Sequence, residues 1–425
     1  MRFHRSLIGV ALALLAAFAT AQTPPTNPPA TPPTAQAPGD RPLTKEQRDE
    51  VLKALGDIMA NRAFVPGLDL NKWPEYLEKQ REDLDKVEKV SDLSRTVNRA
   101  LRDFGISHVR FLTPTQAENR NRTTVVSIGV MARPEKSTLI VTTVIPDGPA
   151  ATAGIKQGDV IIEVDGKAPE SPAVLTGEIG SEVKLKVKSG DAEKELTLKR
   201  ASVSNARPET LTWVAEDTAV LRIWTFSRGY NRRNIETLMK EASQKAKYMI
   251  IDLRSNGGGS TANLLHLLSL FVKADTDIGT FVGRSTVRDY EKDNTPSTDP
   301  IKIAAAAKNK YRTRKQTLEP FAGKVAVLIN RGSASASEIF ATGLREAINA
   351  PILGTRSAGA VLASVFGTLP QGFQIQYPVS DYVSIKGVRL EKNPIVPDIE
   401  VTGTVQDGKD PVVEKAVEKL KSAAR

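Results

Sequence analysis

The chain has 425 residues, of which 40% are hydrophobic and 25% charged, a composition typical of soluble globular proteins with roughly two to four domains. The absence of cysteine excludes a disulfide framework, a thiolate metal site and a cysteine nucleophile. The formal net charge of +10 is dispersed among interleaved acids, and only 5% of residues are aromatic. The sequence therefore disfavours nucleic-acid binding and is compatible only with loose attraction to an acidic envelope surface.

The first 21 residues have the pattern of a secretory signal. Arg2 and Arg5 form a basic start, residues 7–18 are mostly apolar, and Ala19-Thr20-Ala21 is a cleavage pattern. We expect cleavage before Gln22 and export to the periplasm, the cell envelope or the medium. Loss of the two arginines lowers the net charge from +10 to +8. An uncleaved membrane anchor is the alternative, because the proline-rich segment that follows would suit a tether.

Residues 22–43 are rich in proline, threonine and alanine, which predicts an extended linker. Residues 44–120 are predicted to form an N-terminal helical domain, with Thr44 as a candidate N-cap. Apolar residues recur at helical spacing beside this cap: Leu43, Val51, Leu52, Leu55, Ile58 and Met59. The helical pattern continues to about residue 107 and ends in the stretch FGISHVRFL.

Residues 121–203 contain short β-like runs separated by Gly, Asp and Pro. Within them, Ile145–Lys167 (IPDGPAATAGIKQGDVIIEVDGK) resembles the core of a PDZ domain. The resemblance implies a loop whose N–H groups bind a peptide's terminal carboxylate while the peptide adds a strand to the sheet edge. The best match to that loop is Ser127-Ile128-Gly129-Val130, which keeps one of the family's two glycines. The alternative is a PDZ fold that only braces the rest of the chain.

Residues 204–405 alternate strands with helices of about ten or more residues, which indicates βαβ units in an α/β layer. The expected strands are residues 218–224, 247–254 and 324–330, and the helices that follow them are residues 231–245, 263–273 and 337–349. Residues 273–310 interrupt this alternation and could include a flexible insertion near the site, and an amphipathic helix is expected within residues 406–425. The predicted fold class is α+β and multidomain, with N-terminal helices, a β-rich domain and an α/β core.

Three serines alternate with alanines in Gly332–Glu338 (GSASASE), at the junction of an expected strand and helix. A nucleophile suits this place, because backbone N–H groups and the positive end of a helix stabilise developing negative charge. Equally, Ser335 and Glu338 form an S-x-x-E capping box that would only start the helix. The stretch alone leaves both interpretations open.

A second loop, Ile250–Ser260 (IIDLRSNGGGS), places three glycines between a strand and a helix. Its N–H groups could cradle a phosphate, but the lysine of a P-loop is missing. The loop could equally supply an oxyanion-hole donor. Asp252 and Arg254 are expected to form an internal ion pair that shapes it.

Together, residues 252–259 and 332–338 resemble the paired signatures of the carboxyl-terminal processing (tail-specific) proteases, peptidase family S41. The resemblance extends over residues 44–405 and includes the PDZ-like segment. It implies that Ser335 is the nucleophile and that the Ala336 N–H is one oxyanion donor. The second donor implied by the resemblance is Gly257 or Gly258.

The chain departs from the common family pattern at the general base. Most bacterial members carry a lysine in a G-x-x-[ST]-x-G-K run, and the matching run here, Gly354–Ala360, ends in alanine. An alanine side chain cannot take a proton. Either the chain is a catalytically inactive, protease-like PDZ binding or scaffold protein, or another base serves Ser335, such as a histidine or an out-of-register lysine.

The chain has three histidines. His4 lies in the signal, and His266 lies on the apolar face of an expected helix, which indicates a structural role. The segment FGISH, which ends at His108, resembles tricorn-type members of the same family, and these use a histidine base with a preceding serine and a late glutamate. The resemblance implies His108 as the base, with Ser107 beside it and Glu391 acting directly, through Ser107 or through water.

The sequence therefore predicts an exported serine endopeptidase whose protein or peptide substrates are engaged through free C-terminal segments. It implies no cofactor, no metal and no nucleic-acid partner, and it leaves a homo-oligomer open. His108 precedes the PDZ-like segment and Ser335 follows it, so the site can assemble only if the N-terminal helices dock on the α/β core.

Overall fold

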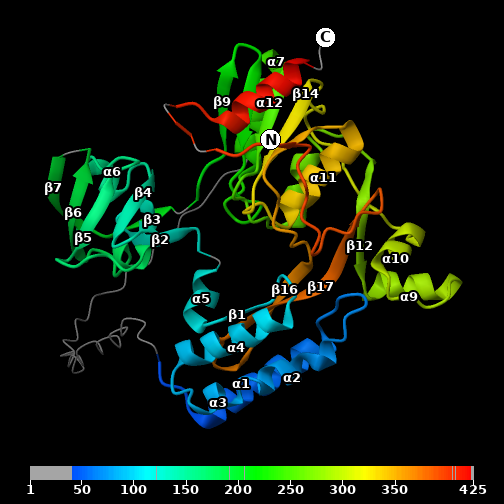
Figure 1. Ribbon diagram of the computed structural model, residues 1–425, viewed down its shortest axis with the longest axis horizontal. Coiled ribbons are helices and arrows are strands. Elements are labelled where there is room, and N and C mark those ends of the chain that lie inside the picture. The colour runs from blue at the N-terminus through cyan, green and yellow to red at the C-terminus, as the bar shows by residue number, and fades with distance from the viewer. Residues whose placement is uncertain are drawn as a thin grey trace, which may run out of the picture. The chain divides into compact units, whose positions relative to one another are not determined.

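The computed structural model describes residues 41–425 except 121, 191, 205, 404, 407 and 423–425, and its elements are named as in Figure 1. The predicted signal and nearly all of the predicted linker lie outside the described residues. In the part of the chain that the structure describes, no helix is long and apolar enough to cross a membrane.

The N-terminal helices begin at the predicted cap. Thr44 Oγ1 accepts the Gln47 N–H, and the Gln47 side chain accepts the Thr44 N–H in return. The helical elements of this region are α1, Lys45–Asn61; η1, Leu70–Lys72; α2, Trp73–Glu78; α3, Arg81–Asp85; and α4, Val90–Phe104. Gly105 ends α4 at φ 74°, a left-handed conformation that favours glycine.

The core of these helices is shared with a distant part of the chain. Leu55 and Trp73 belong to the same buried cluster as Phe373 and Ile375, which lie more than 290 residues later in the sequence. The helices are therefore not a separately packed unit, in contrast to the separate helical domain that the sequence suggested. Local periodicity shows which face of a helix is buried but not which partner covers it.

A five-stranded sheet also joins the N-terminal region to the C-terminal part of the chain. Its order is β1-β17-β12-β13, with β16 also paired to β17. Its strands are β1, Arg110–Leu112; β12, Asp277–Gly283; β13, Tyr311–Arg312; β16, Ala363–Thr368; and β17, Gln374–Ser384. Pairing of β1 with β17 anchors the segment that carries His108 beside the C-terminal part of the chain.

Residues 273–310, which interrupt the expected strand–helix alternation, form regular elements in the structure. These residues contain β12 and two helices, α9 (Arg284–Asp293) and α10 (Pro300–Ala306). Ile303 and Ala304 of α10 are buried against Val282 and Val383 of the sheet, so the segment has a small core of its own. Its polar sequence hid this packing, because only a few apolar residues make the contact.

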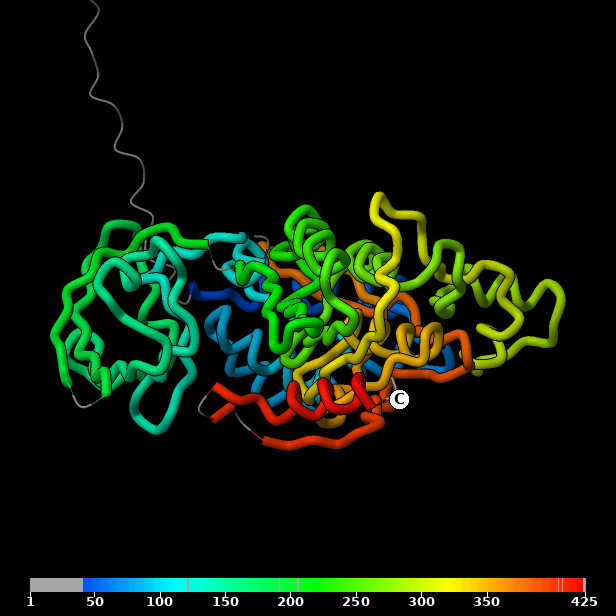
Figure 2. Tube along the Cα trace, turned by 90° about the horizontal axis from the view of Figure 1, so that it is seen from above, coloured from blue at the N-terminus to red at the C-terminus, as the bar shows by residue number. Residues whose placement is uncertain are grey.

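Residues 124–204 form the β-rich unit, whose chain path Figure 2 traces as a compact bundle. Strands β2 (Thr124–Ser127) and β8 (Ala201–Ser204) pair with each other. The remaining strands form an antiparallel sheet in sequence order: β3, Val130–Glu135; β4, Thr138–Val144; β5, Val160–Val164; β6, Glu182–Ser189; and β7, Ala192–Lys199. Short helices α6 (Pro149–Thr152) and η2 (Pro172–Leu175) complete the unit. It buries its own cluster, which includes Ile128 and Leu139.

The α/β core is built on a six-stranded sheet of order β18-β15-β14-β11-β10-β9, in which every pair except β9–β10 is parallel. Its strands are β9, Thr210–Ala215; β10, Thr218–Arg222; β11, Tyr248–Asp252; β14, Lys324–Ile329; β15, Ile352–Gly354; and β18, Ile399–Glu400. The predicted fold class is thus confirmed. The carboxyl ends of parallel strands meet at one edge, where ligands usually bind in such sheets.

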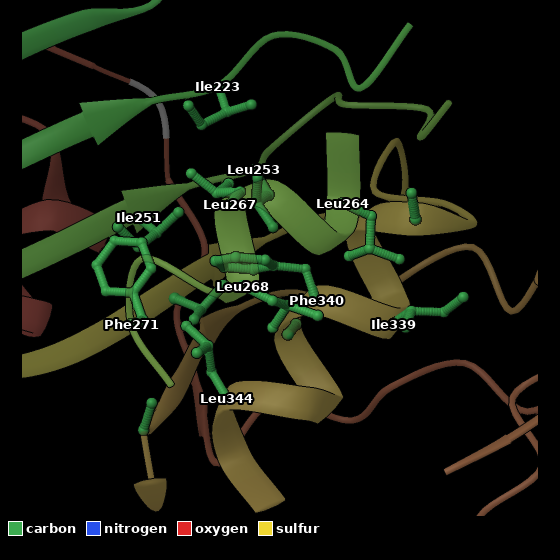
Figure 3. Close-up of a cluster of buried hydrophobic side chains, with 14 of the residues drawn as sticks. Ile223, Ile251, Leu253, Leu264, Leu267, Leu268, Phe271, Ile339, Phe340 and Leu344 are labelled. Atoms are coloured by element: carbon green, nitrogen blue, oxygen red, sulfur yellow. The ribbon is translucent and has the colours of Figure 1, made fainter. Parts of the chain in front are cut away.

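Helices cover both faces of this sheet. Val325 and Val327 of β14 pack into a cluster with α7 (Arg232–Lys245), α8 (Thr261–Leu268) and α11 (Ala336–Ile348). The alternate residues Ala326 and Leu328 pack against α12 (Pro411–Ser422), because successive side chains of a strand point to opposite faces. Figure 3 shows Phe340 and Leu344 of α11 meeting Leu268 of α8 and Phe271 in the first cluster.

Candidate active site

The three serines after β14 have different surroundings. Ser333 Oγ donates to the Leu253 carbonyl at 2.9 Å, and Ser337 Oγ donates to the Asn256 carbonyl at 2.8 Å. Both residues are fully buried, whereas Ser335 is partly exposed and its hydroxyl makes no capping bond to α11. Ser335 is therefore the serine whose hydroxyl is left for chemistry, and the outer two fasten the turn to the loop after β11.

The backbone at Ser335 is strained. Its φ of 57° and ψ of −118° lie where glycine, but rarely another residue, is stable, at a cost of about 1–3 kcal/mol. A sharp strand-to-helix turn of this kind lifts a serine hydroxyl above a sheet in other hydrolytic folds. The surrounding bonds hold the strained conformation, among them the Ser335 N–H to Ala360 carbonyl bond of 2.9 Å.

The glycine loop, Gly257–Gly259, lies directly against this turn. A Cβ built on Gly258 would come within 2.7 Å of Ser335 Cβ, and the φ of Gly258 is 92°, so only glycine fits. The Gly258 N–H donates to Asn256 Oδ1 at 2.9 Å and is thus already engaged in this structure. Gly257 is exposed, and throughout the described residues neither its N–H nor that of Ala336 has a hydrogen-bond partner.

Asn256 and Glu338 organise the site; in the sequence analysis Glu338 had only a helix-capping role and Asn256 had no role of its own. Asn256 is fully buried; its side chain bonds Ile223 O and Gly258 N–H, and its carbonyl accepts from Ala334 N–H. Both residues stand inside the motifs, and the sequence signal for Glu338 was the capping-box spacing from Ser335.

Glu338 is the N3 residue of the predicted capping box. Its carboxylate accepts the Ser335 N–H and also binds Ser357 Oγ, Gly359 N–H and Ala360 N–H. Burial raises the pKa of Glu338, and these donors oppose that rise. The carboxylate therefore ties the segment that includes Ala360 to the turn at Ser335.

Ser107 and His108, which are adjacent in the sequence, meet Glu391, which lies more than 280 residues later. Ser107 Oγ lies 2.7 Å from His108 Nδ1 and donates to Glu391 Oε2 at 2.8 Å. Glu391 is 2% exposed and also accepts the N–H groups of Ser107 and Val361. The glutamate thus meets the histidine through Ser107, one of the routes that the sequence left open.

The histidine tautomer follows from these bonds. Because the Ser107 hydroxyl donates to the carboxylate, it accepts from His108 Nδ1–H, and Nε2 is the unprotonated nitrogen. Burial lowers the pKa of His108, and the negative charge of Glu391 partly opposes that shift. His108 is therefore neutral at pH 7, with a lone pair on Nε2.

One cavity of about 740 Å³ contains the groups predicted to react. Its wall includes His108, Ser335, Ala336 and Gly257, together with apolar side chains such as Phe281 and Phe366. In the described part of the chain no hydrogen bond joins His108 to Ser335, so the two face the same space without touching. Glu391 and Ser107 lie behind His108, outside the wall.

Asp252, Arg254 and His266, to which the sequence analysis gave structural roles, lie outside the wall of this cavity. Asp252 and Arg254 form the expected ion pair, with 2.7 Å between Arg254 Nη2 and Asp252 Oδ2, and Asp410 accepts from the same guanidinium. His266 is buried away from the cavity, bonded to Tyr230 and Glu236. The expectation that His266 does not act at the reacting bond therefore agrees with its position.

The predicted carboxylate-binding loop of the β-rich unit is Ser127–Val130. Its Gly129 N–H donates to Ser127 Oγ at 3.0 Å, so this amide is already engaged. Val130 begins β3, which is the first strand of its sheet and leaves one edge unpaired among the described strands. The loop and that edge adjoin each other, as strand addition by a peptide requires.

Comparisons with known proteins agree with this architecture. Residues 217–401 match the model of peptidase family S41, and residues 126–199 match that of the PDZ domain. A probable CtpA-like serine protease of Staphylococcus haemolyticus is 25% identical over 283 residues, which are 65% of this chain and 52% of that protein. The chloroplastic carboxyl-terminal-processing peptidase 1 of Arabidopsis thaliana is 26% identical over 360 residues, 80% of this chain and 69% of that protein. The chain spans about half the length of the first of these relatives.

Solved structures have the same fold. The photosystem II D1 C-terminal processing protease superposes with a TM-score of 0.50 at 22% identity, over 90% of this chain and 99% of that one. The tricorn protease superposes with a TM-score of 0.52 at 16% identity, over 88% of this chain and 37% of that one. Residues 217–401 therefore form a peptidase family S41 domain, and residues 126–199, which precede it, form a PDZ domain.

Proposed function

We propose that this chain is a serine endopeptidase in which Ser335 attacks the scissile carbonyl and His108 takes the serine proton. The observation that carries the proposal is the hydrogen-bonded series Glu391–Ser107–His108, which ends at a neutral imidazole in the wall of the cavity that also holds Ser335. A histidine of this kind can accept a proton near pH 7 and return it to the leaving amine.

Ser107 is the relay between acid and base. When His108 Nε2 takes the Ser335 proton, the imidazolium keeps its Nδ1–H bond to Ser107 Oγ, whose own hydrogen points at the Glu391 carboxylate. The carboxylate thereby stabilises the imidazolium through one hydroxyl and fixes the tautomer beforehand, the work done by a directly bonded aspartate in other serine proteases. Closure of the gap between His108 and Ser335 accompanies substrate binding.

Two unpartnered amides receive the oxyanion in this proposal. Ala336 N–H, at the first turn of α11, and Gly257 N–H both border the cavity next to Ser335. The positive end of the 13-residue helix α11 adds to their effect. Removal of one such donor from a serine protease costs about 100- to 1,000-fold in kcat.

A lysine base is not needed for this chemistry. Ala360 presents only its carbonyl to Ser335 N–H, and Glu338, the nearest carboxylate to the turn, is fully buried with four donors already bound. We assign Glu338 a holding role because its oxygens are occupied. The interpretation as an inactive scaffold rests on the missing lysine alone. The neutral imidazole of His108 in the cavity wall supports a different base, and therefore an active enzyme.

Substrate engagement belongs to the same proposal. The PDZ domain takes a free C-terminal segment of an exported protein as an added strand on β3, with its carboxylate at Ser127–Val130, and delivers the chain to the cavity. Cleavage of the N-terminal signal places the enzyme in the periplasm, the envelope or the medium.

Turnover of an unstructured protein by wild type, Ser335→Ala and His108→Ala tests the assignment. The proposal predicts loss of hydrolysis in both variants. Undiminished hydrolysis by Ser335→Ala overturns the nucleophile and with it the function, whereas loss in Ser335→Ala with retention in His108→Ala assigns the proton to another base. Absence of hydrolysis by the wild type on any unstructured substrate favours the scaffold instead.

A further inference from the structure

A trio of polar side chains, of which Tyr230 and His266 are buried, lies outside the catalytic cavity. Tyr230 OH is 2.7 Å from His266 Nδ1, and His266 Nε2 is 3.1 Å from Glu236 Oε1. Tyr230 is 7% exposed and His266 5%, and none of the three lines the cavity that holds Ser335. The trio therefore cannot touch the reacting bond, and its bonds need another explanation.

The direction of the bonds is fixed. Burial raises the pKa of Tyr230, so its hydroxyl stays protonated and donates to His266 Nδ1. Nε2 then carries the ring hydrogen and donates to Glu236. Burial also lowers the pKa of His266; the charge of Glu236 opposes the shift and that of Arg232 adds to it, so the ring is neutral. Tyr311 and Arg314 face the same small cavity as His266.

The ring of Tyr230 is connected to the glycine loop through Phe226. The two rings stack with centroids 5.8 Å apart. The Phe226 N–H donates to Gly258 O at 2.9 Å, and the Phe226 carbonyl accepts the Ser260 N–H at 2.9 Å. A Cβ built on Gly259 would come within 2.3 Å of the Phe226 carbonyl carbon, so the two backbones are in contact. A shift of the Phe226 backbone would therefore act directly on the glycine loop.

We propose that the trio of Tyr230, His266 and Glu236 positions Phe226 and, through it, the glycine loop that receives the oxyanion. The trio acts from behind the loop and joins three elements: the chain before α7, α7 itself and α8. Without the hydrogen bond of its hydroxyl, the Tyr230 ring can shift against Phe226. The Gly257 N–H is then no longer oriented toward the oxyanion, the former carbonyl oxygen of the substrate that Ser335 has attacked. The inference rests on the proposed function, since it concerns the same oxyanion.

The test compares Tyr230→Phe and His266→Gln in the full chain with Thr313→Val as matched control. Tyr230→Phe removes one buried hydroxyl and keeps the stacked ring. Thr313→Val also removes a fully buried hydroxyl, one whose hydrogen-bond partners are Lys273 and Thr276, outside both the trio and the glycine loop. Hydrolysis is measured per active serine, titrated with a fluorophosphonate, so that misfolded enzyme does not enter kcat. Glu236→Ala is the variant that folding tolerates best, because that side chain is 41% exposed.

We expect kcat of Tyr230→Phe and of His266→Gln to fall about tenfold at unchanged KM, with no further loss in the double variant, because both act on one network. Affinity for a peptide boronate, whose adduct on Ser335 places an oxygen in the oxyanion site, falls by the same factor. Thr313→Val lowers the unfolding temperature only.

Values of kcat and boronate affinity within twofold of wild type in all three trio variants, whatever their unfolding temperatures, overturn the inference and leave the trio a packing feature. A rise in KM with unchanged kcat overturns it as well, since oxyanion placement acts in the transition state. Failure of the proposed function is distinguishable, because it appears as hydrolysis that survives Ser335→Ala.

Discussion

Replacement of Ser107 by alanine removes the one hydroxyl that connects Glu391 to His108. In the ground state the variant loses two bonds, of 2.7 and 2.8 Å, while Glu391 keeps the Val361 N–H at 2.9 Å and remains satisfied in its buried position. In the transition state the lost bonds are those of an imidazolium and a carboxylate. Hydrogen bonds to charged groups contribute about 1.5–3 kcal/mol, which corresponds to a fall in kcat of about 10- to 150-fold.

The assay is hydrolysis of a quenched fluorogenic peptide with kcat and KM determined separately. KM should stay within about twofold of wild type, because Ser107 lies behind His108 and does not line the cavity. Ser107→Thr keeps a hydroxyl at the same carbon and should recover most of the rate. Wild-type kcat in Ser107→Ala, or equal losses in the alanine and threonine variants, would refute the relay.

Four further outcomes follow from the site. Glu391→Gln removes the charge that holds up the pKa of His108, so the acid limb of kcat/KM should move to lower pH; a shift to higher pH would contradict the reasoning. Gly258→Ala forces a Cβ within 2.7 Å of Ser335 Cβ at φ 92° and should cost more than about 2 kcal/mol in the free energy of unfolding and most of the activity, whereas Gly56→Ala, in open space within α1, should stabilise by about 0.5–1 kcal/mol. Glu338→Gln leaves an amide facing four donors and should lower both unfolding temperature and kcat, so a variant as stable as wild type speaks against the holding role. Burial lowers the pKa of both His108 and His266, so the unfolded chain binds more protons than the folded chain below about pH 6.5. The free energy of unfolding should therefore be highest above about pH 6.5 and decline as the pH falls below it. In denaturant titrations from pH 7 to 5, the double variant His108→Asn, His266→Gln should show a less steep decline than wild type.

The sequence predicted the site best where a motif of reactive residue types falls on an expected strand–helix junction. Strand–helix alternation and the turn signals around β14 and β11 placed both loops at the carboxyl edge of one sheet. The absence of the family's lysine at Ala360 directed attention to His108. Its contact with Glu391, 283 positions away in the chain, was inferred by resemblance, since no spacing rule links such distant residues.

Details that depend on side-chain geometry could not be predicted. Gly257 and Gly258 are equivalent in the motif, and only the Asn256 side chain, which binds the Gly258 N–H, separates them. The N-terminal helices looked like a domain of their own because their periodicity is complete, yet Phe373 and Ile375 from another part of the chain fill their core. His266 was predicted to be structural from its apolar neighbours, and its bond to Tyr230 could be found only in three dimensions.

The central claim is that His108 activates Ser335, and the rate of covalent labelling tests it most directly. A fluorophosphonate probe with peptide mapping reports attack by Ser335 alone, without substrate delivery or product release. The account predicts labelling of wild type at Ser335 with a rate that rises as His108 loses its proton, and a loss of at least about 100-fold in His108→Ala. Labelling of Ser335 in His108→Ala at the wild-type rate and with the same pH profile would contradict it.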